Sequence, residues 1–397
     1  MNFDFKRRLN GLQERMRKLN IDLVVFGSCQ NFQYLTGLTE GWIFNWRSGI
    51  DLGSAVSNFF VGKHHDPILT LPKQYAERTV NTDTWIKDVR ILEDGEIFGY
   101  HYGENYGKLV RKVLSDLEIT DEASVGLGEH VWGSTVSEIA LVAKHAKYSA
   151  ARGLLDHVRM IKDEGEIAAL RKVAKLTDQV MERVLPKIKN GVTQPEIELE
   201  AELQGRLLGA SDVSFPPIVR FIRHGSEPWP VPITYPREEG LVSGSSIAFD
   251  IGFVRDGYCS DLGRSFYYGF PDAEIREGYE ALHASVLETV DKIRTDNTRA
   301  CDLFPIAETY LDQQGFGKYL PAYLPKTLGH GIGVEVHERP CLTPAYEDAL
   351  CTNMVLAVEP RLWSPGKYYV RVEDMVLVGP RKSEFLTNFD RQIFVLS

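Results

Sequence analysis

The sequence predicts an α/β protein of two domains, and three observations favour this fold class. The chain has 397 residues, of which 43% are hydrophobic and 25% are charged, a composition typical of globular proteins with room for two or three cores. Short β-rich runs alternate with helical patterns over roughly the first 150 residues. From about residue 212 onward the chain is rich in strands, with only two further helical patterns.

The predicted elements of the first domain, residues 1–158, follow from hydrophobic spacing. An amphipathic helix is expected over the first 20 residues, with an apolar stripe made of Leu9, Leu12, Met16 and Leu19. Strands are expected at 21–28 and 66–72, and a helix at 103–119. The aromatic segment 40–52 is predicted to form a loop, either a lid or a surface anchor.

The second domain, residues 159–397, is predicted from a charge-rich passage at 152–166, within which the domain boundary is expected near 155–162. A long helix follows, with one stripe formed by Ile167, Leu170, Ala174, Thr177, Met181 and Val184 and a C-cap at Gly191. A helix over 193–210 opens with a Thr-x-x-Glu capping box. Two more helices are expected near 272–294 and 302–314.

Composition and charge exclude several classes of function. A net charge of -10 and a pI near 5.6 give no basic footprint for nucleic acid or anionic lipid. No apolar run reaches the roughly 18 residues of a membrane span, and the N-terminal pattern has no secretory apolar region. The five cysteines form no Cys-x-x-Cys pair and suit reduced thiols. A cytoplasmic protein is expected.

Two aspartates, Asp250 and Asp261, lie in apolar runs on either side of an Arg-Asp-Gly turn signal that predicts a β-hairpin. A turn at Arg255-Asp256 pairs residues whose numbers add up to 511, so that the two aspartates face each other. A turn at Asp256-Gly257 gives 513 and makes them diagonal neighbours on one face. Converging carboxylates need a compensating cation, for which a divalent metal is the simplest candidate. The alternative is a slipped register in which one aspartate only caps the turn.

A second acidic pair repeats this pattern. Glu359 and Glu373 lie in apolar runs around Ser-Pro-Gly-Lys, and a hairpin centred on Gly366 brings them opposite each other, because their numbers add up to 732. Between the two acidic pairs, glycines flank His330, and His337 follows. The five residues Asp250, Asp261, His330, Glu359 and Glu373 offer oxygen ligands, one nitrogen and no thiolate. Such a set suits two bridged metal ions better than one tetrahedral zinc.

At this point the chain resembles the pita-bread metallopeptidases, in the branch of aminopeptidase P, prolidase and creatinase. The matching motifs are D-I-G-(x)4-G-Y-x-S-D at 250–261, G-H-G-I-G-x-x-V-H-E at 329–338, V-E-P at 358–360 and R-V-E-D at 371–374. Residues 28–37 are similar to the extra N-terminal domain of that branch. The resemblance implies a creatinase-like α/β domain followed by a pita-bread catalytic domain with a curved antiparallel sheet.

The resemblance also implies a ligand set for two divalent metal ions, manganese first, with cobalt, iron or zinc as alternatives. Asp261 and Glu373 would bridge the ions, Asp250 would complete one site, and His330 with Glu359 the other. Two cations about 3.5 Å apart would supply a bridging hydroxide that attacks an amide carbonyl. Glu359 would then pass a proton to the leaving nitrogen, and His337 would stabilise the oxyanion.

Arg371 lies two residues before Glu373, so it is expected on the same face, where it would hold a carboxylate or the substrate. A supporting salt bridge is the alternative. Asp374 should point the other way and be structural.

The match weakens upstream of Asp250, where the family carries a Pro-His that this chain lacks. Arg220, Arg223, His224 and Trp229 occupy this segment and are candidates for substrate binding, with solvent-facing arginines as the alternative.

An Xaa-Pro peptidase acting on a peptide substrate is the leading hypothesis. The alternative is a non-peptidase enzyme on the same scaffold, either a small-molecule lyase or a small-amide hydrolase. A silent binding module would have lost its ligands, whereas all five are present here. The resemblance further implies a homodimer, in which the loop at Trp42 to Trp46 would lie near the neighbour's site.

Overall fold

The structure, a computed structural model, describes most of the chain. The described residues are 3–38, 56–79, 85–93, 102–232, 236–295, 297–322, 324–391 and 395–396. The loop predicted over 40–52, with Trp42 and Trp46, lies outside them. The chain divides into two compact units, one of Asp4–Val158 and one of Arg159–Ser397 together with Phe3.

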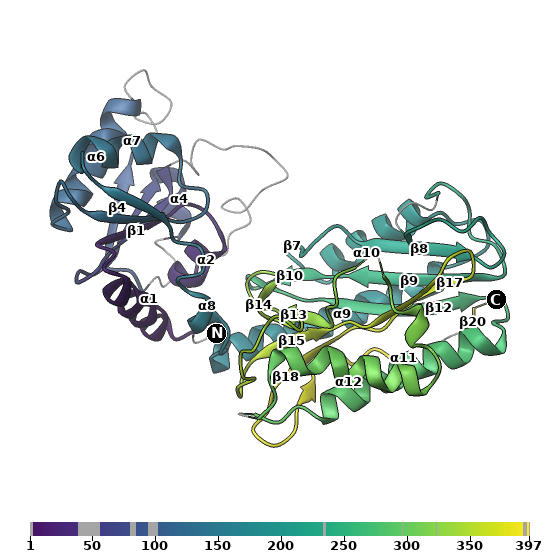
Figure 1. Ribbon diagram of the computed structural model, residues 1–397. Helices are drawn as coiled ribbons and strands as arrows, with labels where there is room; N and C mark the ends of the chain where they lie inside the picture. Colours follow the sequence, from purple (N-terminus) through teal and green to yellow (C-terminus); the bar gives the residue numbers. More distant parts are fainter. Residues whose placement is uncertain are drawn as a thin grey trace. The chain divides into compact units, whose positions relative to one another are not determined.

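The first unit is built on a six-stranded mixed sheet with strand order β4-β3-β2-β1-β5-β6 (Figure 1). Its strands are β1 (Leu23–Phe26), β2 (Asn58–Gly62), β3 (Ile68–Pro72), β4 (Asp88–Leu92), β5 (Ser124–Leu127) and β6 (Lys147–Ala150). The two strands predicted in this half correspond to β1 and β3. β1 pairs antiparallel with β2 and parallel with β5, so the sheet is mixed.

Helices precede, separate and follow these strands along the chain. They are α1 (Phe5–Leu19), α2 (Gln30–Thr36), α4 (Lys73–Thr79), α6 (Tyr102–Asp116), α7 (Gly133–Val142) and α8 (Asp156–Arg159). The N-terminal helix and the helix at 103–119 are confirmed as α1 and α6. On α1 the expected stripe is buried at Leu9, Leu12 and Met16, whereas Leu19 in the last turn is 48% exposed.

Four long helices belong to the second unit. They are α9 (Glu164–Val184), α10 (Gln194–Leu207), α11 (Ala273–Asp291) and α12 (Ala300–Gln313), and short 3-10 turns follow α9 (η1, Leu185–Lys187) and α12 (η3, Gly317–Tyr319). The predicted C-cap of the first at Gly191 is wrong, because that helix ends at Val184 with Leu185 as its C-cap and a 3-10 turn follows before the left-handed Gly191. The capping box of α10 is present, with Thr193 and Glu196 bonding each other's backbone N–H groups. All six stripe residues of α9 are buried, as predicted.

The strands of the second unit form small sheets. They are β7 (Asp212–Val213), β8 (Ile218–Arg223), β9 (Ser245–Ile251), β10 (Phe253–Arg255), β11 (Tyr258–Cys259), β12 (Leu262–Tyr268), β13 (Gly329–Gly331), β14 (Glu338–Cys341), β15 (Val355–Val358), β16 (Arg361–Ser364), β17 (Tyr368–Arg371), β18 (Asp374–Leu377), β19 (Glu384–Phe385) and β20 (Val395–Leu396). The sheet orders are β11-β10-β7, β20-β12-β9-β8, β14-β13-β15-β18-β19 and β16-β17. Apart from the parallel pair of β12 and β20, the strand pairs described in this unit are antiparallel.

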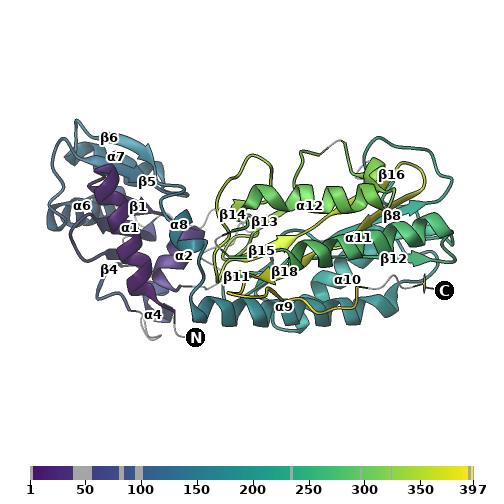
Figure 2. The ribbon, with the colours of Figure 1, turned by 60° about the horizontal axis from the view of Figure 1, so that its bottom comes forward.

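Two apolar cores hold the helices of the second unit against its strands. One core joins α9 and α10 to β8, β9 and β12 through residues such as Val180, Ile197 and Phe249. The other joins α11 and α12, which lie side by side in Figures 1 and 2, to β15 and β18 through residues such as Leu282 and Leu356. The two cores fix the strands from which the candidate site is built.

Within the part of the chain that the structure describes, no helix combines the length and the apolar character needed to cross a membrane. The five cysteines are free thiols.

Candidate metal centre

The first acidic pair lies on the hairpin formed by β9 and β12. The backbone partner of Asp250 is Gly263, so paired residue numbers add up to 513, the second of the two registers considered from the sequence. Gly252 interrupts the first strand of the hairpin, and Asp261 lies in the gap between β11 and β12. The two aspartates are therefore diagonal neighbours, as that register predicts.

Gly263 lets a second chain segment approach this hairpin closely. Its N–H and C=O pair with the backbone of Glu373, and a Cβ at position 263 would lie 2.9 Å from the Glu373 Cβ. A larger residue here would push the Glu373 segment away from the aspartates. The glycine thus brings the two hairpins into contact.

The second hairpin has the predicted register. Arg361 pairs with Arg371 and Val358 with Asp374, so paired numbers add up to 732 on both sides of the acidic residues. Glu359 follows β15 directly, and Glu373 directly precedes β18. Both glutamates are buried, as their apolar surroundings in the sequence suggested.

His330 lies on β13, beside the strand that leads to Glu359. Gly329 has φ +146°, and a Cβ there would lie 1.9 Å from the Ala357 carbonyl oxygen, so only glycine permits this close pairing with β15. The His330 Nε2 lies 3.6 Å from the Asp261 Oδ2 and 3.8 Å from the Glu359 Oε1. The imidazole therefore reaches into the space between the two acidic pairs.

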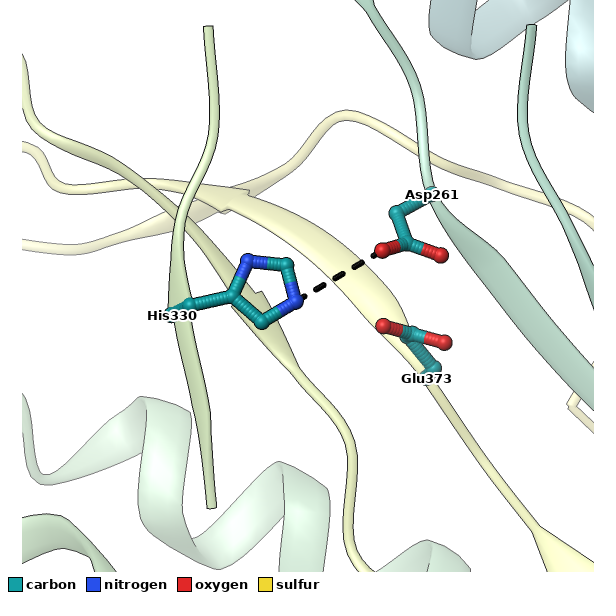
Figure 3. Close-up of side chains that lie close together, drawn as sticks. All are labelled: Asp261, His330 and Glu373. Carbon is teal, nitrogen blue, oxygen red and sulfur yellow. Dashed lines mark ion pairs between the residues drawn. The ribbon is translucent and has the colours of Figure 1, made fainter. Parts of the chain in front are cut away.

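Three of the five candidate ligands come together in one cluster. Asp261, His330 and Glu373 each offer a ligand atom, and these atoms all lie within 4.8 Å of one another. Figure 3 shows the imidazole directed toward the two carboxylates. The other two, Asp250 and Glu359, adjoin this cluster through a shared partner, Arg371.

Arg371 lies among four acidic residues and bonds three of them. Its Nη2 donates to Glu359 Oε2 at 2.7 Å and to Glu373 Oε2 at 2.6 Å, and its Nη1 donates to Asp250. The sequence left two roles open for Arg371: holding a carboxylate or the substrate, and forming a supporting salt bridge. In the structure Arg371 forms salt bridges, and its partners are three of the candidate ligands. One guanidinium offsets part of the repulsion among buried carboxylates.

The carboxylates respond differently to this environment. Burial, together with the charges of Glu373 and Asp250, raises the pKa of Asp261 well above its usual value. Burial also raises the pKa of Glu373, to about 8, and raises that of Asp250. Burial acts on Glu359 too, but Arg371 and Arg361 hold its pKa below the ordinary value. Burial lowers the pKa of His330 to about 4, so its imidazole is neutral at pH 7.

A test for metal binding is whether the site has acceptors that the protein leaves unused. Asp250 Oδ1, Asp261 Oδ1 and Glu373 Oε1 are buried and have no hydrogen-bond partner among the described residues. Buried carboxylate oxygens without partners are costly, and a neutral imidazole beside them is a ligand for divalent metals. The donor set therefore fits divalent cations.

His337 lies next to the cluster and is exposed, at the end of a turn whose other residues are buried or half-buried. Its ring centroid is 4.3 Å from that of His330, in an edge-to-face arrangement. The following residue, Glu338, is buried and bonds Arg159 at 2.7 Å, while Lys162 lies 3.4 Å away. Arg159 also bonds Glu335 at 2.7 Å. Two cations at the start of this unit thus hold both ends of the His337 turn.

Arg361 is a residue of the site that the sequence reasoning missed. It stands opposite Arg371 on the β16 and β17 hairpin, and its Nη2 donates to Glu359. The hairpin register that pairs Glu359 with Glu373 also pairs Arg361 with Arg371. The position of Arg361 beside the site could therefore have been predicted from the sequence.

The proposed substrate residues lie away from the cluster. β8 pairs Ile218 with Asp250 but Arg223 with Ser245, which puts Arg223 about 17 Å along the strand from the metal candidates. Arg223, His224 and Trp229 are exposed, and the 225–228 segment packs against the turn at Gly366. Arg220 is buried and bonds Glu198, so it does not face solvent.

Comparisons with known proteins agree with this architecture. Residues 168–380 match the model of metallopeptidase family M24, and residues 8–161 match that of the creatinase/prolidase N-terminal domain. The YkvY protein of Bacillus subtilis (strain 168) is 28% identical over 340 residues, which cover 85% of this chain and 88% of that protein.

Solved structures match over almost the whole chain. A dipeptidase from Pyrococcus horikoshii OT3 superposes with a TM-score of 0.81 at 25% identity, covering 98% of this chain and 100% of that one. An Xaa-Pro dipeptidase from Bacillus anthracis gives 0.81 at 23% identity, covering 99% and 100%. The predicted fold class is confirmed: a creatinase-like α/β domain precedes a pita-bread domain.

Proposed function

The chain belongs to metallopeptidase family M24, and we propose that it is a metal-dependent peptidase of the Xaa-Pro type, similar to prolidase. One observation carries this proposal: Asp261, His330 and Glu373 bring ligand atoms within 4.8 Å of one another, beside buried carboxylate oxygens that lack partners. The names of the solved relatives, a dipeptidase and an Xaa-Pro dipeptidase, support the choice of substrate.

Five residues would hold the cations, namely Asp250, Asp261, His330, Glu359 and Glu373. Bound divalent cations would supply a water of lowered pKa and polarise the substrate carbonyl. We propose two ions, manganese first, because four carboxylates outnumber the single imidazole and oxygen ligands suit that ion.

The other tasks fall to side chains around the cluster. Glu359 is held ionised by Arg371 and Arg361, so it can accept a proton and pass it to the leaving nitrogen. His337 is exposed beside His330 and can donate a hydrogen bond to the oxyanion of the tetrahedral intermediate. Arg371 orients three of the carboxylates.

The direct test is hydrolysis by protein that has been stripped of metal and then reloaded with Mn or Co. We expect Ala-Pro to be cleaved and Ala-Ala to be cleaved far more slowly. A longer peptide, Ala-Pro-Ala-Ala, distinguishes an aminopeptidase from a dipeptidase. If none of these substrates is turned over by fully loaded protein, the proposal fails, and a small-amide hydrolase or a lyase takes its place.

The finer assignments form part of the same proposal. Residues 1–158 and 159–397 would be the two folding domains, and the protein would act in the cytoplasm as a homodimer. Arg223, His224 and Trp229 would contact parts of the substrate remote from the scissile bond, because they lie toward the far end of β8 from Asp250. Light scattering tests the dimer, and a monomeric mass would exclude it.

A further inference from the structure

Arg264 is buried behind the joint between the two acidic hairpins, and the function proposed above gives it no task. It lies on β12, directly after Gly263, and its side chain is 0% exposed. The five N–H groups of its guanidinium each donate one hydrogen bond. The acceptors are Asp374 Oδ1 at 2.7 Å and the carbonyl oxygens of Gly263 at 2.7 Å, Glu373 at 2.6 Å, Phe389 at 2.9 Å and Asp390 at 3.2 Å. A guanidinium with all its donors engaged is held in one orientation.

The backbone of Glu373 depends on this arginine. Glu373 lies between β17 and β18 and pairs with Gly263 through a single bridge outside the regular strands. In that bridge the Gly263 N–H reaches the Glu373 carbonyl oxygen only at 3.4 Å, whereas the Arg264 Nη1 reaches the same oxygen at 2.6 Å. Strand alternation directs the Glu373 side chain to the cluster and the Asp374 side chain to Arg264. Arg264 thus holds the peptide that carries a candidate ligand from the side opposite the cluster.

A long helix of the same unit anchors Arg264. Asp178 on α9 accepts the backbone N–H of Asn388 at 2.8 Å and that of Phe389 at 3.0 Å, one on each carboxylate oxygen. The Phe389 carbonyl in turn accepts a hydrogen bond from Arg264. A continuous series of hydrogen bonds therefore runs from α9 through the segment 388–389 to the guanidinium and ends at the Glu373 carbonyl. Groups that fix a ligand in this way determine how well it meets a metal ion.

A second arginine, Arg391, shares one partner with Arg264 but does not reach the ligand. Its Nε donates to Asp374 Oδ2 at 2.7 Å, and its Nη2 donates to Asp374 Oδ1 at 3.1 Å and to the Thr387 carbonyl at 2.9 Å. Among the described residues it makes no hydrogen bond with Glu373. Loss of Arg391 therefore removes positive charge beside Asp374 and leaves the grip on the Glu373 carbonyl in place.

We propose, on the basis of the metal-dependent peptidase function, that Arg264 is a positioning residue for the candidate ligand Glu373. By holding the Glu373 carbonyl, it fixes the place at which the Glu373 carboxylate is offered to divalent cations. Arg264 contacts neither the cluster nor the substrate, so its influence reaches them through Glu373 alone. Its loss should weaken metal binding and slow the chemical step, while substrate binding stays as it is.

The first test measures Mn binding in Arg264→Met and Arg264→Lys by titration calorimetry of the metal-free protein at pH 7. We expect the affinity of Arg264→Met to fall about 10- to 100-fold. Arg264→Lys keeps the charge but has a single ammonium in place of the planar fork, so it should recover part of that loss. With Mn at saturation, kcat for Ala-Pro should fall in the same order while KM stays near wild type.

The second test separates positioning from stability. The visible absorption spectrum of protein loaded with Co(II) responds to the arrangement of the ligands, and both Arg264 variants should change it. Arg391→Met is the matched control, because it removes a cation from the same Asp374 without touching Glu373. It should lower the melting temperature but keep the Mn affinity and the Co(II) spectrum of wild type. A purely structural role of Arg264 would lower the melting temperature and leave affinity and spectrum unchanged.

The failures can be told apart. If both Arg264 variants bind Mn as wild type does and give its Co(II) spectrum, the positioning role is wrong while the peptidase stands. If Arg391→Met weakens Mn binding as much as Arg264→Met, the effect runs through Asp374, and the role assigned to the Glu373 carbonyl is wrong. If loaded wild type cleaves no peptide, the peptidase function is wrong, and the Mn affinities still decide the role of Arg264. Where Arg264→Met does not fold, Arg264→Lys decides it.

Discussion

Arg371 and Glu373 are two residues apart in extended chain, and the Arg371 Nη2 lies 2.6 Å from the Glu373 Oε2. The same guanidinium bonds Asp250 and Glu359, so a single cation joins residues from both hairpins. Arginine and divalent metal therefore serve the same electrostatic purpose in this site: both offset the repulsion of four carboxylates, of which those of Asp261, Glu359 and Glu373 are buried.

Arg371→Met should destabilise the metal-free protein strongly and the metal-loaded protein much less. Removing one partner of a buried ion pair costs about 3–5 kcal/mol, and bound cations would restore most of the lost compensation. Thermal unfolding in EDTA and in Mn measures the difference. Arg299→Met, which breaks an exposed pair with Asp302, is the control and should change stability by less than about 1 kcal/mol. Equal losses in EDTA and in Mn would contradict this account.

Replacement of the clustered ligands should remove metal and activity together. Asp261→Asn, His330→Ala and Glu373→Gln each delete a donor from the cluster, and each is expected to lower activity by more than about 100-fold. Metal analysis after reconstitution gives the bound stoichiometry. His145→Ala changes an exposed imidazole in the other unit and should bind metal as wild type does. A variant of the cluster that keeps its full metal complement would remove that residue from the ligand set.

Metal binding should release protons at pH 7. Burial raises the pKa of Glu373 to about 8, so this carboxyl tends to hold its proton at pH 7 in the metal-free protein, and burial raises the pKa of Asp261 in the same direction. Cations bind the ionised forms, and the apparent affinity should therefore rise with pH, about tenfold per unit for each proton released. Calorimetry at pH 7 in two buffers with different ionisation enthalpies counts these protons. Heats that do not depend on the buffer would exclude the linkage.

The same shift affects the stability of the metal-free protein. A carboxyl whose folded pKa is raised stabilises the fold while it is protonated, and that contribution is lost as pH rises from the ordinary glutamate pKa of 4.5 through the raised pKa of about 8. In EDTA the protein should therefore unfold at a lower temperature at pH 8.5 than at pH 6. Glu373→Gln cannot ionise and should lose most of this difference.

Much of the site could be predicted because hairpin register follows from simple arithmetic. The 732 register placed Glu359 and Glu373 correctly. Strand alternation correctly predicted that Asp374 points away from the site, and Asp374 pairs there with Arg264 at 2.7 Å. The first hairpin kept two registers open, because Asp256 and Gly257 can both occupy left-handed turn positions. Their φ values of 53° and 80° show which turn is formed.

The sequence could not predict which strands of the second unit pair with each other or how close their side chains lie. Arg223 ends β8, the strand that precedes the first hairpin in the sequence, but its distance from Asp250 depends on how β8 and β9 are paired. The 732 register also places Arg361 opposite Arg371, whereas the approach of its guanidinium to Glu359 depends on side-chain conformations that residue spacing does not determine. Contacts between elements distant in sequence have no local signal.

Glu338 should act on catalysis through the position of His337. Arg159 and Lys162 hold its buried carboxylate, and its Oε1 also accepts the Glu335 N–H at 3.1 Å across the turn. Arg159→Met is therefore expected to lower kcat by about 10- to 100-fold with metal content unchanged, because the turn loses one of its two cations. Arg159→Lys should recover part of kcat. Loss of metal together with kcat would show that the cluster itself had been disturbed.

His337 is expected to donate a hydrogen bond that forms only in the transition state. Its imidazole is exposed 4.3 Å from the ring of His330, close enough to reach a substrate oxygen but outside the group of clustered ligand atoms. His337→Ala should therefore lower kcat by about 10²- to 10³-fold, while KM and metal content stay near wild type. His337→Asn retains a donor and should recover part of that loss. If His337→Ala instead releases metal as His330→Ala does, His337 belongs to the ligand set, and its assignment as an oxyanion donor is wrong.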